Sequence, residues 1–162
     1  MMLMTAKHVM SPEPITLEPH HRLYHALELM HLHQLRHIPI VDENMRLYGV
    51  VSDRDVKRWM SPTYRTNKET LKDRMSLTKE LSEIANTEPV TVAPDTDLSG
   101  LLEVMLEHQV GSVLVVSRDE DRLLGIITRG DLLKLLKRIA ITATQTDHQI
   151  EGAIAATHHL SS

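Results

Sequence analysis

Hydrophobic and polar positions follow the same order in two segments of this chain. Each segment begins with a short β-type run, residues 14–17 or 89–92, and continues with apolar residues at helical spacing. Two β-branched runs joined by a polar turn come next, and a second helix then begins at Asp53 or Arg129. The apolar face of the first helix consists of Leu23, Ala26, Leu27 and Met30 in one segment and of Leu98, Leu101, Leu102 and Met105 in the other. The pattern predicts the order β-α-β-β-α, twice.

The two segments also match residue by residue. Residues 14–41 align without gaps on residues 89–116, and after a one-residue insertion the match continues as far as Asp55 and Asp131. Each segment alone offers a half-buried sheet that is too small to be stable, and two such sheets can cover each other's apolar faces. We therefore predict an α/β (α+β) fold of two β-α-β-β-α repeats packed with pseudo-two-fold symmetry.

The repeats also divide the chain into parts. We assign residues 1–60 to the first repeat and residues 83–140 to the second. The polar and charged residues 61–82 between them are expected to form a linker. Residues 141–162 are rich in Thr, Ala, Gln and His and are predicted to be a flexible or partner-dependent tail.

Composition restricts the classes of partner. The 162 residues are 41% hydrophobic, and 18 Lys+Arg against 22 Asp+Glu give a formal net charge of −4, which is typical of a folded protein without a strong field. A nucleic-acid-binding protein would carry more basic residues, and with one Trp, three Tyr and no Phe, aromatic stacking platforms are scarce. We therefore expect no direct nucleic-acid partner.

Other functions are disfavoured by missing sequence features. The chain has no cysteine, which excludes disulfides and thiolate chemistry, and it has no apolar stretch of about 18 residues. It also lacks a Gly-rich phosphate loop, a nucleophile elbow and a His-Glu-x-x-His motif. We expect a soluble, cytoplasmic protein without membrane contact, catalytic residues or a catalytic cofactor.

Three stretches of the first repeat resemble a known family. They are Val9-Met-Ser-x-x-Pro-Ile-Thr16, Leu35-Arg-His-Ile-Pro-Ile-Val-Asp42 and Gly49-Val-Val-Ser-Asp-Arg-Asp55. These stretches are similar to the cystathionine-β-synthase (CBS) domain family, and the resemblance covers residues 8–60 and 83–138. It implies a pair of CBS domains, called a Bateman module, that binds AMP, ADP, ATP or S-adenosylmethionine in clefts between its halves. Such modules regulate an attached or associated enzyme, channel or transporter.

The motif Gly-h-h-[Ser/Thr]-x-x-Asp, where h is an apolar residue, occurs in both repeats, ending at Asp55 and at Asp131. A carboxylate near the start of a helix can accept charge-assisted hydrogen bonds from two ribose hydroxyls, and the hydroxyl of Ser52 or Thr128 can join the same sugar. Arg54 and Arg129 add positive charge near these positions. The same residues also satisfy a helix-capping pattern, so both capping and ligand binding stay open.

The resemblance places the adenine against the first β-type run of each repeat. Backbone groups near Thr16 or Thr91 would read its edge, Ile38 with Pro39 or Val113 with Leu114 would supply apolar contact, and His37 would either contact a phosphate or merely start a strand. The nucleotide-binding residues expected from the motif and the resemblance are Thr16, His37, Ile38, Pro39, Ser52, Arg54, Asp55, Thr91, Val113, Thr128, Arg129 and Asp131.

Histidines offer a competing site. Six of the eleven histidines lie between His20 and His37, and at 100° per residue His21, His25 and Glu28 share the solvent side of the first predicted helix. A His pair four residues apart with a Glu can bind zinc or nickel. Exposed histidines on a polar helix face are the ordinary explanation, so we assign no metal site and keep these three residues as the alternative.

The outer helix faces suggest self-association. Leu29 and Leu32 project outward from the first predicted helix, and Val104 and Leu106 flank the corresponding face of the second repeat. In the CBS family such helices commonly mediate homodimers. We expect a stand-alone regulatory CBS pair that forms a homodimer, binds an adenosine-containing ligand and passes a conformational signal to an unidentified effector protein. The alternatives are a ligand-free scaffold or dimerisation module and a metal-responsive protein.

Overall fold

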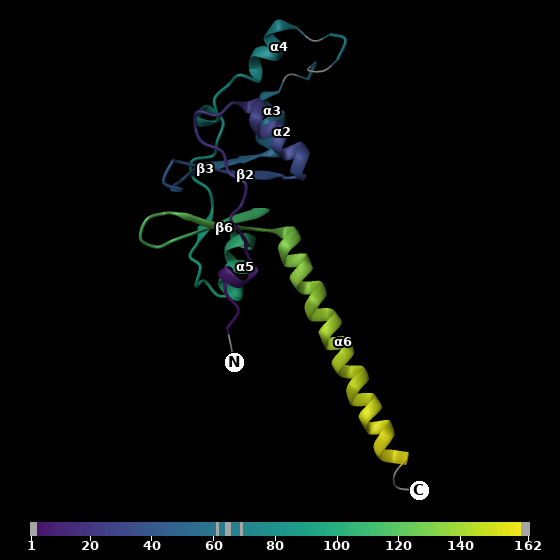
Figure 1. The fold of residues 1–162 in the computed structure, drawn as a ribbon. Coiled ribbons are helices and arrows are strands. Elements are labelled where there is room, and N and C mark those ends of the chain that lie inside the picture. The colour runs from purple at the N-terminus through teal and green to yellow at the C-terminus, as the bar shows by residue number, and fades with distance from the viewer. Residues whose placement is uncertain (1–2, 61, 64–65, 69, 160–162) are drawn as a thin grey trace. The chain divides into compact units, whose positions relative to one another are not determined.

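The computed structural model describes residues 3–60, 62–63, 66–68 and 70–159, so residues 61, 64, 65 and 69 of the predicted linker lie outside the described residues (Figure 1). The chain divides into two compact units, Met1–Ile127 and Thr128–Ser162. The elements of the first unit, with the last residue of β6 shared, are α1 (Ala6–Val9), β1 (Ser11–Pro12), α2 (Leu23–His33), β2 (His37–Val41), β3 (Leu47–Ser52), α3 (Asp53–Trp59), α4 (Leu71–Ser76), the 3-10 helix η1 (Leu81–Glu83), β4 (Thr91–Val92), α5 (Leu98–Glu107), β5 (Ser112–Val116) and β6 (Leu123–Thr128). The second unit consists of α6 (Arg129–His159).

The mixed α/β class and the tandem repeats are confirmed. The first repeat forms the two-stranded antiparallel sheet β2-β3, and the second contributes to a four-stranded sheet with the order β1-β6-β5-β4. Helices α2 and α3 pack together against the β2-β3 hairpin (Figure 1). All four long strands cover the residues that the β-branched runs predict.

The predicted first strand is shorter than expected in both repeats. In the second repeat it is reduced to β4, which pairs in parallel with β5. In the first repeat only one bridge remains, between Leu17 and Ile40. The first strand is shorter in the first repeat because a backbone donor is missing there. The Leu114 N–H of β5 donates to the Val90 carbonyl at 3.1 Å, whereas Pro39 at the equivalent position has no N–H to donate.

The segment that precedes each repeat pairs with the other repeat. Ser11 of β1 lies opposite Ile126 of β6, and at the equivalent positions, offset by 75 and 76 residues, Asn86 lies opposite Val50. The same exchange continues upstream. The Ala6 N–H donates to the Thr96 carbonyl at 2.7 Å, and the equivalent Leu81 N–H donates to the His21 carbonyl at 2.8 Å. The two repeats are therefore interlocked by symmetric hydrogen bonds, and residues 3–12 are bonded to the second repeat rather than to the first.

The glycine of the repeated motif is required where the segment that precedes one repeat crosses a strand of the other repeat. A Cβ on Gly49 would lie 2.5 Å from the Asn86 carbonyl oxygen, and a Cβ on Gly125 would lie 2.5 Å from the Met10 sulfur and 2.9 Å from the Ser11 carbonyl oxygen. The segment that precedes the second repeat passes Gly49 of β3, and the segment that precedes the first repeat passes Gly125 of β6. Both pass too close for a Cβ to fit without movement of a neighbour. The motif glycines thus serve the packing of the repeats.

Two apolar clusters among the described residues show how the parts of the first unit are joined. The core of the first repeat includes Leu81, from the predicted linker, and Ile84, from the start of the second repeat. A second cluster joins the two sheets and consists of Val41, Leu114, Leu123 and Ile126. At the same junction the Leu47 N–H donates to the Asp121 carbonyl at 3.0 Å, and the equivalent Leu123 N–H donates to the Met45 carbonyl at 2.9 Å. The two repeats therefore share hydrogen bonds as well as apolar contacts.

The second unit is one continuous helix. Residues 141–159, predicted to be a flexible or partner-dependent tail, extend α6 without a break. The hydroxyls of Thr142, Thr144 and Thr146 each donate to the carbonyl four residues earlier. Dependence of this helix on a partner stays a prediction. No helix within the described part of the chain is both long and apolar enough to span a bilayer.

Candidate functional site

The candidate site of the first repeat is built on the β2-β3 hairpin. Its register places His37 directly opposite Ser52, at the end of the hairpin where α3 begins. The Asp53 N–H donates to the Arg36 carbonyl at 2.8 Å, which fixes the start of α3 against the start of β2. The hairpin therefore brings His37, Ser52 and the first turn of α3 together.

Ser52 and Asp55 form a reciprocal cap at the start of α3. The backbone N–H and the hydroxyl of Ser52 donate to Asp55 Oδ2 at 2.8 and 2.7 Å, and the Asp55 N–H donates to the Ser52 Oγ at 3.2 Å. The capping role expected for this pair is confirmed. Asp55 Oδ1 accepts no hydrogen bond from the described residues, so the carboxylate keeps an acceptor while it caps the helix. Capping and ligand binding are compatible at this residue.

The apolar positions of β2 face different ways. Ile38 is fully buried in the core of the first repeat, so its side chain is not available to a ligand. Pro39 alternates with Ile38 along the strand and shares the strand face of His37. Thr16 lies beside this strand, because the Leu17 N–H donates to the Pro39 carbonyl at 3.1 Å and the Val41 N–H donates to the Leu17 carbonyl at 2.9 Å. The structure thus brings Thr16 next to Pro39, and the side chains of Ile38 and Pro39 are both fully buried, so neither is available to a ligand.

Burial controls the charge of His37. Loss of hydration lowers the pKa of His37 below its usual value of 6.5, the nearby carboxylates of Asp53 and Asp55 partly oppose this, and Arg36 and Arg54 reinforce it. The imidazole is therefore neutral at pH 7 in the structure. Arg36, before β2, and Arg54, at the start of α3, are both exposed.

The second repeat carries the same cap. The backbone N–H and the hydroxyl of Thr128 donate to Asp131 Oδ2 at 2.8 and 3.0 Å, and the Asp131 N–H donates to the Thr128 Oγ1 at 3.3 Å. Arg129 is exposed as the first residue of α6. These three residues form a group of their own in the second unit.

The remaining predicted residues of the second repeat lie in the first unit. Thr91 is an exposed residue of β4, opposite Leu114 of β5. Val113 is fully buried, as its equivalent Ile38 is, so its side chain is also unavailable to a ligand. Leu114 is buried in the cluster that joins the two sheets.

A third cap of the same kind lies outside the repeats, and the motif Gly-h-h-[Ser/Thr]-x-x-Asp does not include it. The backbone N–H and the hydroxyl of Thr70 donate to Asp73 Oδ2 at 2.6 and 2.8 Å, and the Thr63 hydroxyl donates to the same oxygen at 2.8 Å. Asp73 is buried. The Thr-x-x-Asp signal was readable in the sequence, and here it serves the start of α4. The cap alone therefore does not identify a ligand site, and the preceding hairpin with its histidine is the distinguishing feature of the first repeat.

The histidines of α2 do not form a metal cluster. His21 Nδ1 accepts the Glu18 N–H at 2.8 Å, and His25 Nδ1 accepts the Arg22 N–H at 3.0 Å, so both rings are engaged with the backbone at the start of the helix. Burial, followed by the neighbouring His20 and His25, lowers the pKa of His21. Among the described residues, no group of three or more His, Cys, Asp or Glu side chains is placed to hold a metal ion. The structure does not gather His21, His25 and Glu28 into such a site.

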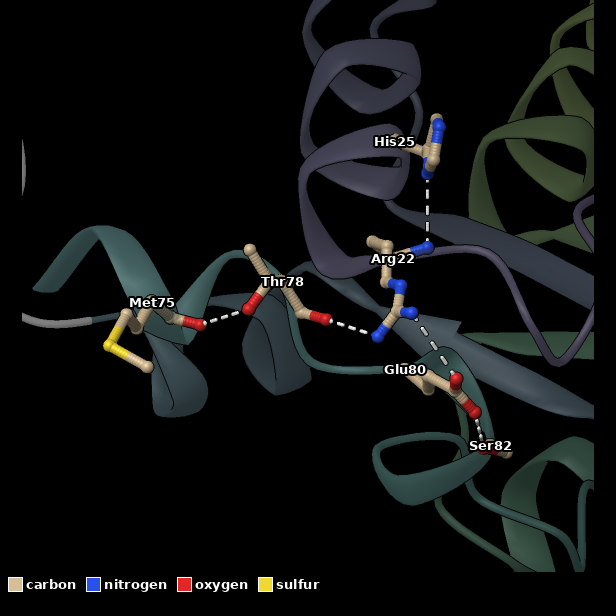
Figure 2. A network of polar contacts seen from close by, with 6 residues as sticks. All are labelled: Arg22, His25, Met75, Thr78, Glu80 and Ser82. Atoms are coloured by element: carbon tan, nitrogen blue, oxygen red, sulfur yellow. Dashed lines mark hydrogen bonds and ion pairs between the residues drawn. The ribbon is translucent and has the colours of Figure 1, made fainter. Parts of the chain in front are cut away.

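The same region instead attaches the linker to the first repeat. Figure 2 shows the Arg22 guanidinium between Thr78 and Glu80, with His25 above the Arg22 backbone. Arg22 donates to the Thr78 carbonyl at 2.8 Å and lies 3.5 Å from a Glu80 carboxylate oxygen. Ser82 in turn donates to Glu80 at 3.4 Å. His25 thus belongs to a structural network that docks the linker.

Comparison with known sequences identifies the family. The CBS domain profile matches residues 6–62 and 81–138, and the chain belongs to this family. A CBS domain-containing protein of Dictyostelium discoideum is 30% identical over 139 residues, which cover 85% of this chain and 94% of that protein. The inosine-5'-monophosphate dehydrogenase of Methanocaldococcus jannaschii is 28% identical over 160 residues, which cover 93% of this chain but only 29% of the dehydrogenase.

Solved structures support the same assignment. A putative acetoin utilization protein (AcuB) from Vibrio cholerae superposes with a TM-score of 0.72 and 30% identity, over 91% of this chain and 98% of that one. CBSX2 of Arabidopsis thaliana, crystallised with AMP, gives a TM-score of 0.69 and 26% identity over 85% and 98% of the two chains. The CBS domain pair of protein MJ0100, in complex with 5'-methylthioadenosine and S-adenosyl-L-methionine, gives 0.67 and 25% over 84% and 98%. CBS pairs related to this chain therefore bind adenosine-containing ligands.

Proposed function

We propose that this chain is a regulatory CBS domain pair that binds an adenosine-containing ligand and transmits a conformational signal to a partner protein. The observation that carries the proposal is the geometry of Asp55, which caps α3 through Oδ2 while Oδ1 accepts no hydrogen bond from the described residues. Related pairs hold AMP, methylthioadenosine and S-adenosylmethionine, all of which carry a ribose or a ribose derivative. A carboxylate with a remaining acceptor suits the ribose hydroxyls that these ligands share.

The neighbours of Asp55 complete the proposed first site. Ser52 supplies a hydroxyl beside the carboxylate, and the backbone near Thr16 reads the adenine edge. Neutral His37 accepts or donates a single hydrogen bond, and Arg54 provides the positive charge for a phosphate. Thr128, Arg129 and Asp131 of the second unit are proposed to bind ribose and phosphate. Contact between adenine and the backbone near Thr91, in the first unit, stays a separate prediction.

Thermal unfolding tests ligand binding directly. Protein stripped of nucleotide is unfolded with AMP, ADP, ATP, S-adenosylmethionine or Zn²⁺. A ligand at about 100 times its dissociation constant stabilises the folded state by about 2.7 kcal/mol, which shifts the melting temperature by several degrees in a chain of this size. Stabilisation by one adenosine compound supports the proposal. Absence of any nucleotide effect would favour a ligand-free scaffold, and a shift with Zn²⁺ alone would favour metal binding.

The substitution Asp55→Asn tests the assigned role. The amide still offers an oxygen to the Ser52 donors, whereas the charge that strengthens the ribose hydrogen bonds is lost, so affinity is expected to fall about ten-fold or more by calorimetry. Asp131→Asn makes the same test in the second repeat. The matched control is Asp73→Asn, which changes an equivalent cap outside the repeats and leaves affinity unchanged. If all three variants bind the ligand as tightly as the natural chain, the carboxylates of Asp55 and Asp131 do not contact the ligand.

The regulatory role includes a homodimer and an effector. Leu32 on α2 and Leu106 on α5 are 68% and 78% exposed, whereas Leu29 packs partly against the core and Val104 is half-buried. We propose that the outer faces of α2 and α5 meet a second copy, and that the ligand changes this arrangement for an effector protein. The chain would act in the cytoplasm as a regulator rather than as an enzyme. Weaker self-association of Leu32→Glu and Leu106→Glu in sedimentation experiments tests the interface.

A further inference from the structure

Apolar side chains form a line along one side of helix α6. The helix has 31 residues, a length of about 46 Å at 1.5 Å per residue. Leu136, Ile139, Ala143, Ile150 and Ile154 fall within an arc of about 60° on its surface at 100° per residue. The four larger side chains of this line are 50–60% exposed. Helices in water owe most of their stability to packing of an apolar face, so the exposed side chains of Leu136, Ile139 and Ile150 favour a partner that covers them.

Between residues 136 and 154, three charges flank the line on one edge. Measured around the helix from Leu136, Lys137 lies at about 100°, Asp147 at about 20° and Glu151 at about 60°. The base belongs to the N-terminal half of the helix and the two acids to the C-terminal half. In a parallel pair this edge of one α6 would face the opposite edge of the other, where Ile139, Thr142 and Thr146 offer no opposite charge to these three residues.

An antiparallel second copy makes these charges complementary. If two α6 helices cross at Ala143, Leu136 lies level with Ile150 of the partner subunit. On the charged edge Lys137 then lies between the partner's Asp147 and the partner's Glu151, about 3 Å along the axis from each. The small Ala143 side chain allows the two helices to approach closely at the centre.

We propose that α6 pairs with α6 of a second copy of this chain, antiparallel and centred on Ala143. The acids beside the apolar line disfavour an anionic lipid surface, because helices that lie on such membranes carry Lys and Arg at the border of their apolar face. The pairing is self-complementary, as a two-fold interface requires. It does not depend on nucleotide binding or on the outer faces of α2 and α5.

Disulfide crosslinking tests the register, because the natural chain has no cysteine. Ala143→Cys is expected to oxidise to a crosslinked dimer. Ile150→Cys alone is not, since the two cysteines would lie about 21 Å apart along the axis, and Leu136→Cys combined with Ile150→Cys restores the crosslink. Gln145→Cys, on the opposite side of the helix, is the control that stays uncrosslinked. A crosslink through Ile150→Cys alone would show a parallel pair, and absence of any crosslink would show that α6 does not self-associate; either result overturns the proposal.

Charge reversal provides a second test that does not introduce cysteine. In a chain that also carries Leu32→Glu and Leu106→Glu, Lys137→Glu is expected to weaken dimerisation through α6 about ten-fold or more in sedimentation equilibrium, because three acids then meet along the edge. Combining it with Asp147→Lys and Glu151→Lys exchanges the charges and restores the dimer. Arg138→Glu, on the far side of the helix, leaves it unchanged. Circular dichroism confirms that each variant keeps its helix, and weakening by Arg138→Glu as large as that by Lys137→Glu would contradict the assigned edge.

Discussion

The two repeats carry the same glycines where their backbones cross and equivalent caps at the helix starts, and they differ next to those caps. The crossing glycines, Gly49 and Gly125, and the caps that end at Asp55 and Asp131 occupy equivalent positions. The positions that differ are those next to the cap: His37 corresponds to Ser112 and Arg54 to Gly130. The shared residues therefore reflect packing and helix capping, and the differing residues make the two candidate ligand sites unequal. We expect the two repeats to bind a ligand with unequal affinity.

The largest loss of stability is expected where the segment before the second repeat packs into the core of the first repeat. Leu81 and its equivalent Ala6 are both fully buried, but only Leu81 fills the partner core with a large side chain. Leu81→Ala should destabilise the protein by about 3 kcal/mol through lost burial and a residual cavity. Urea unfolding followed by the fluorescence of Trp59, the one tryptophan of the chain, measures this loss. The control is Leu71→Ala on α4, which is 77% exposed and should change stability by less than about 0.5 kcal/mol.

The interlocking of the repeats was also the main feature that the sequence did not reveal. The long strands and the starts of α2, α3 and α6 follow from local periodicity, which is short-range information. Pairing of Ser11 with Ile126 joins positions more than a hundred residues apart through only two strand residues, and such short segments carry no periodicity. The alignment of the repeats could have been extended upstream, because Ala6 and Val9 correspond to Leu81 and Ile84 at the same offset of 75.

The candidate site was predictable in part for similar reasons. The motif located Ser52, Asp55, Thr128 and Asp131, because capping is a local interaction. The run His37–Val41 is apolar almost throughout, so its pattern does not show which residues face the core. Ile38 was therefore expected to contact a ligand, and only the packing of α2 and α3 on the hairpin reveals that its side chain is part of the core.

The crossing glycines give a smaller effect that differs between the repeats. An alanine Cβ at position 49 meets the backbone carbonyl of Asn86 at 2.5 Å, which can move only with the chain. At position 125 the nearest atom belongs to the flexible Met10 side chain, although the Ser11 carbonyl is also close. We expect Gly49→Ala to cost about 2–3 kcal/mol and Gly125→Ala about 1–2 kcal/mol, measured by denaturant unfolding.

A glycine without close neighbours provides the control for this pair. A Cβ on Gly152 of α6 meets no atom within 4 Å, so Gly152→Ala should stabilise that helix by up to about 1 kcal/mol through its better helix propensity. Equal costs for Gly49→Ala and Gly125→Ala would mean that Met10 is held as rigidly as the backbone. A negligible cost for both would contradict the close crossing itself.

The smallest effect concerns His37, which has no counterpart in the second repeat. Because burial lowers the pKa of His37 below 6.5, the unfolded chain binds more protons than the folded one between that lowered pKa and pH 6.5. The stability that His37 contributes is thus fully present above about pH 6.5 and is lost as the pH falls through its pKa in the folded protein. Thermal unfolding between pH 8 and pH 5 should show a steeper loss for the natural chain than for His37→Gln. Exposed His33→Gln serves as the control and should follow the natural chain. If His37→Gln also follows it, burial does not hold the imidazole neutral, and the first repeat then differs from the second at this position only in the shape of its side chain.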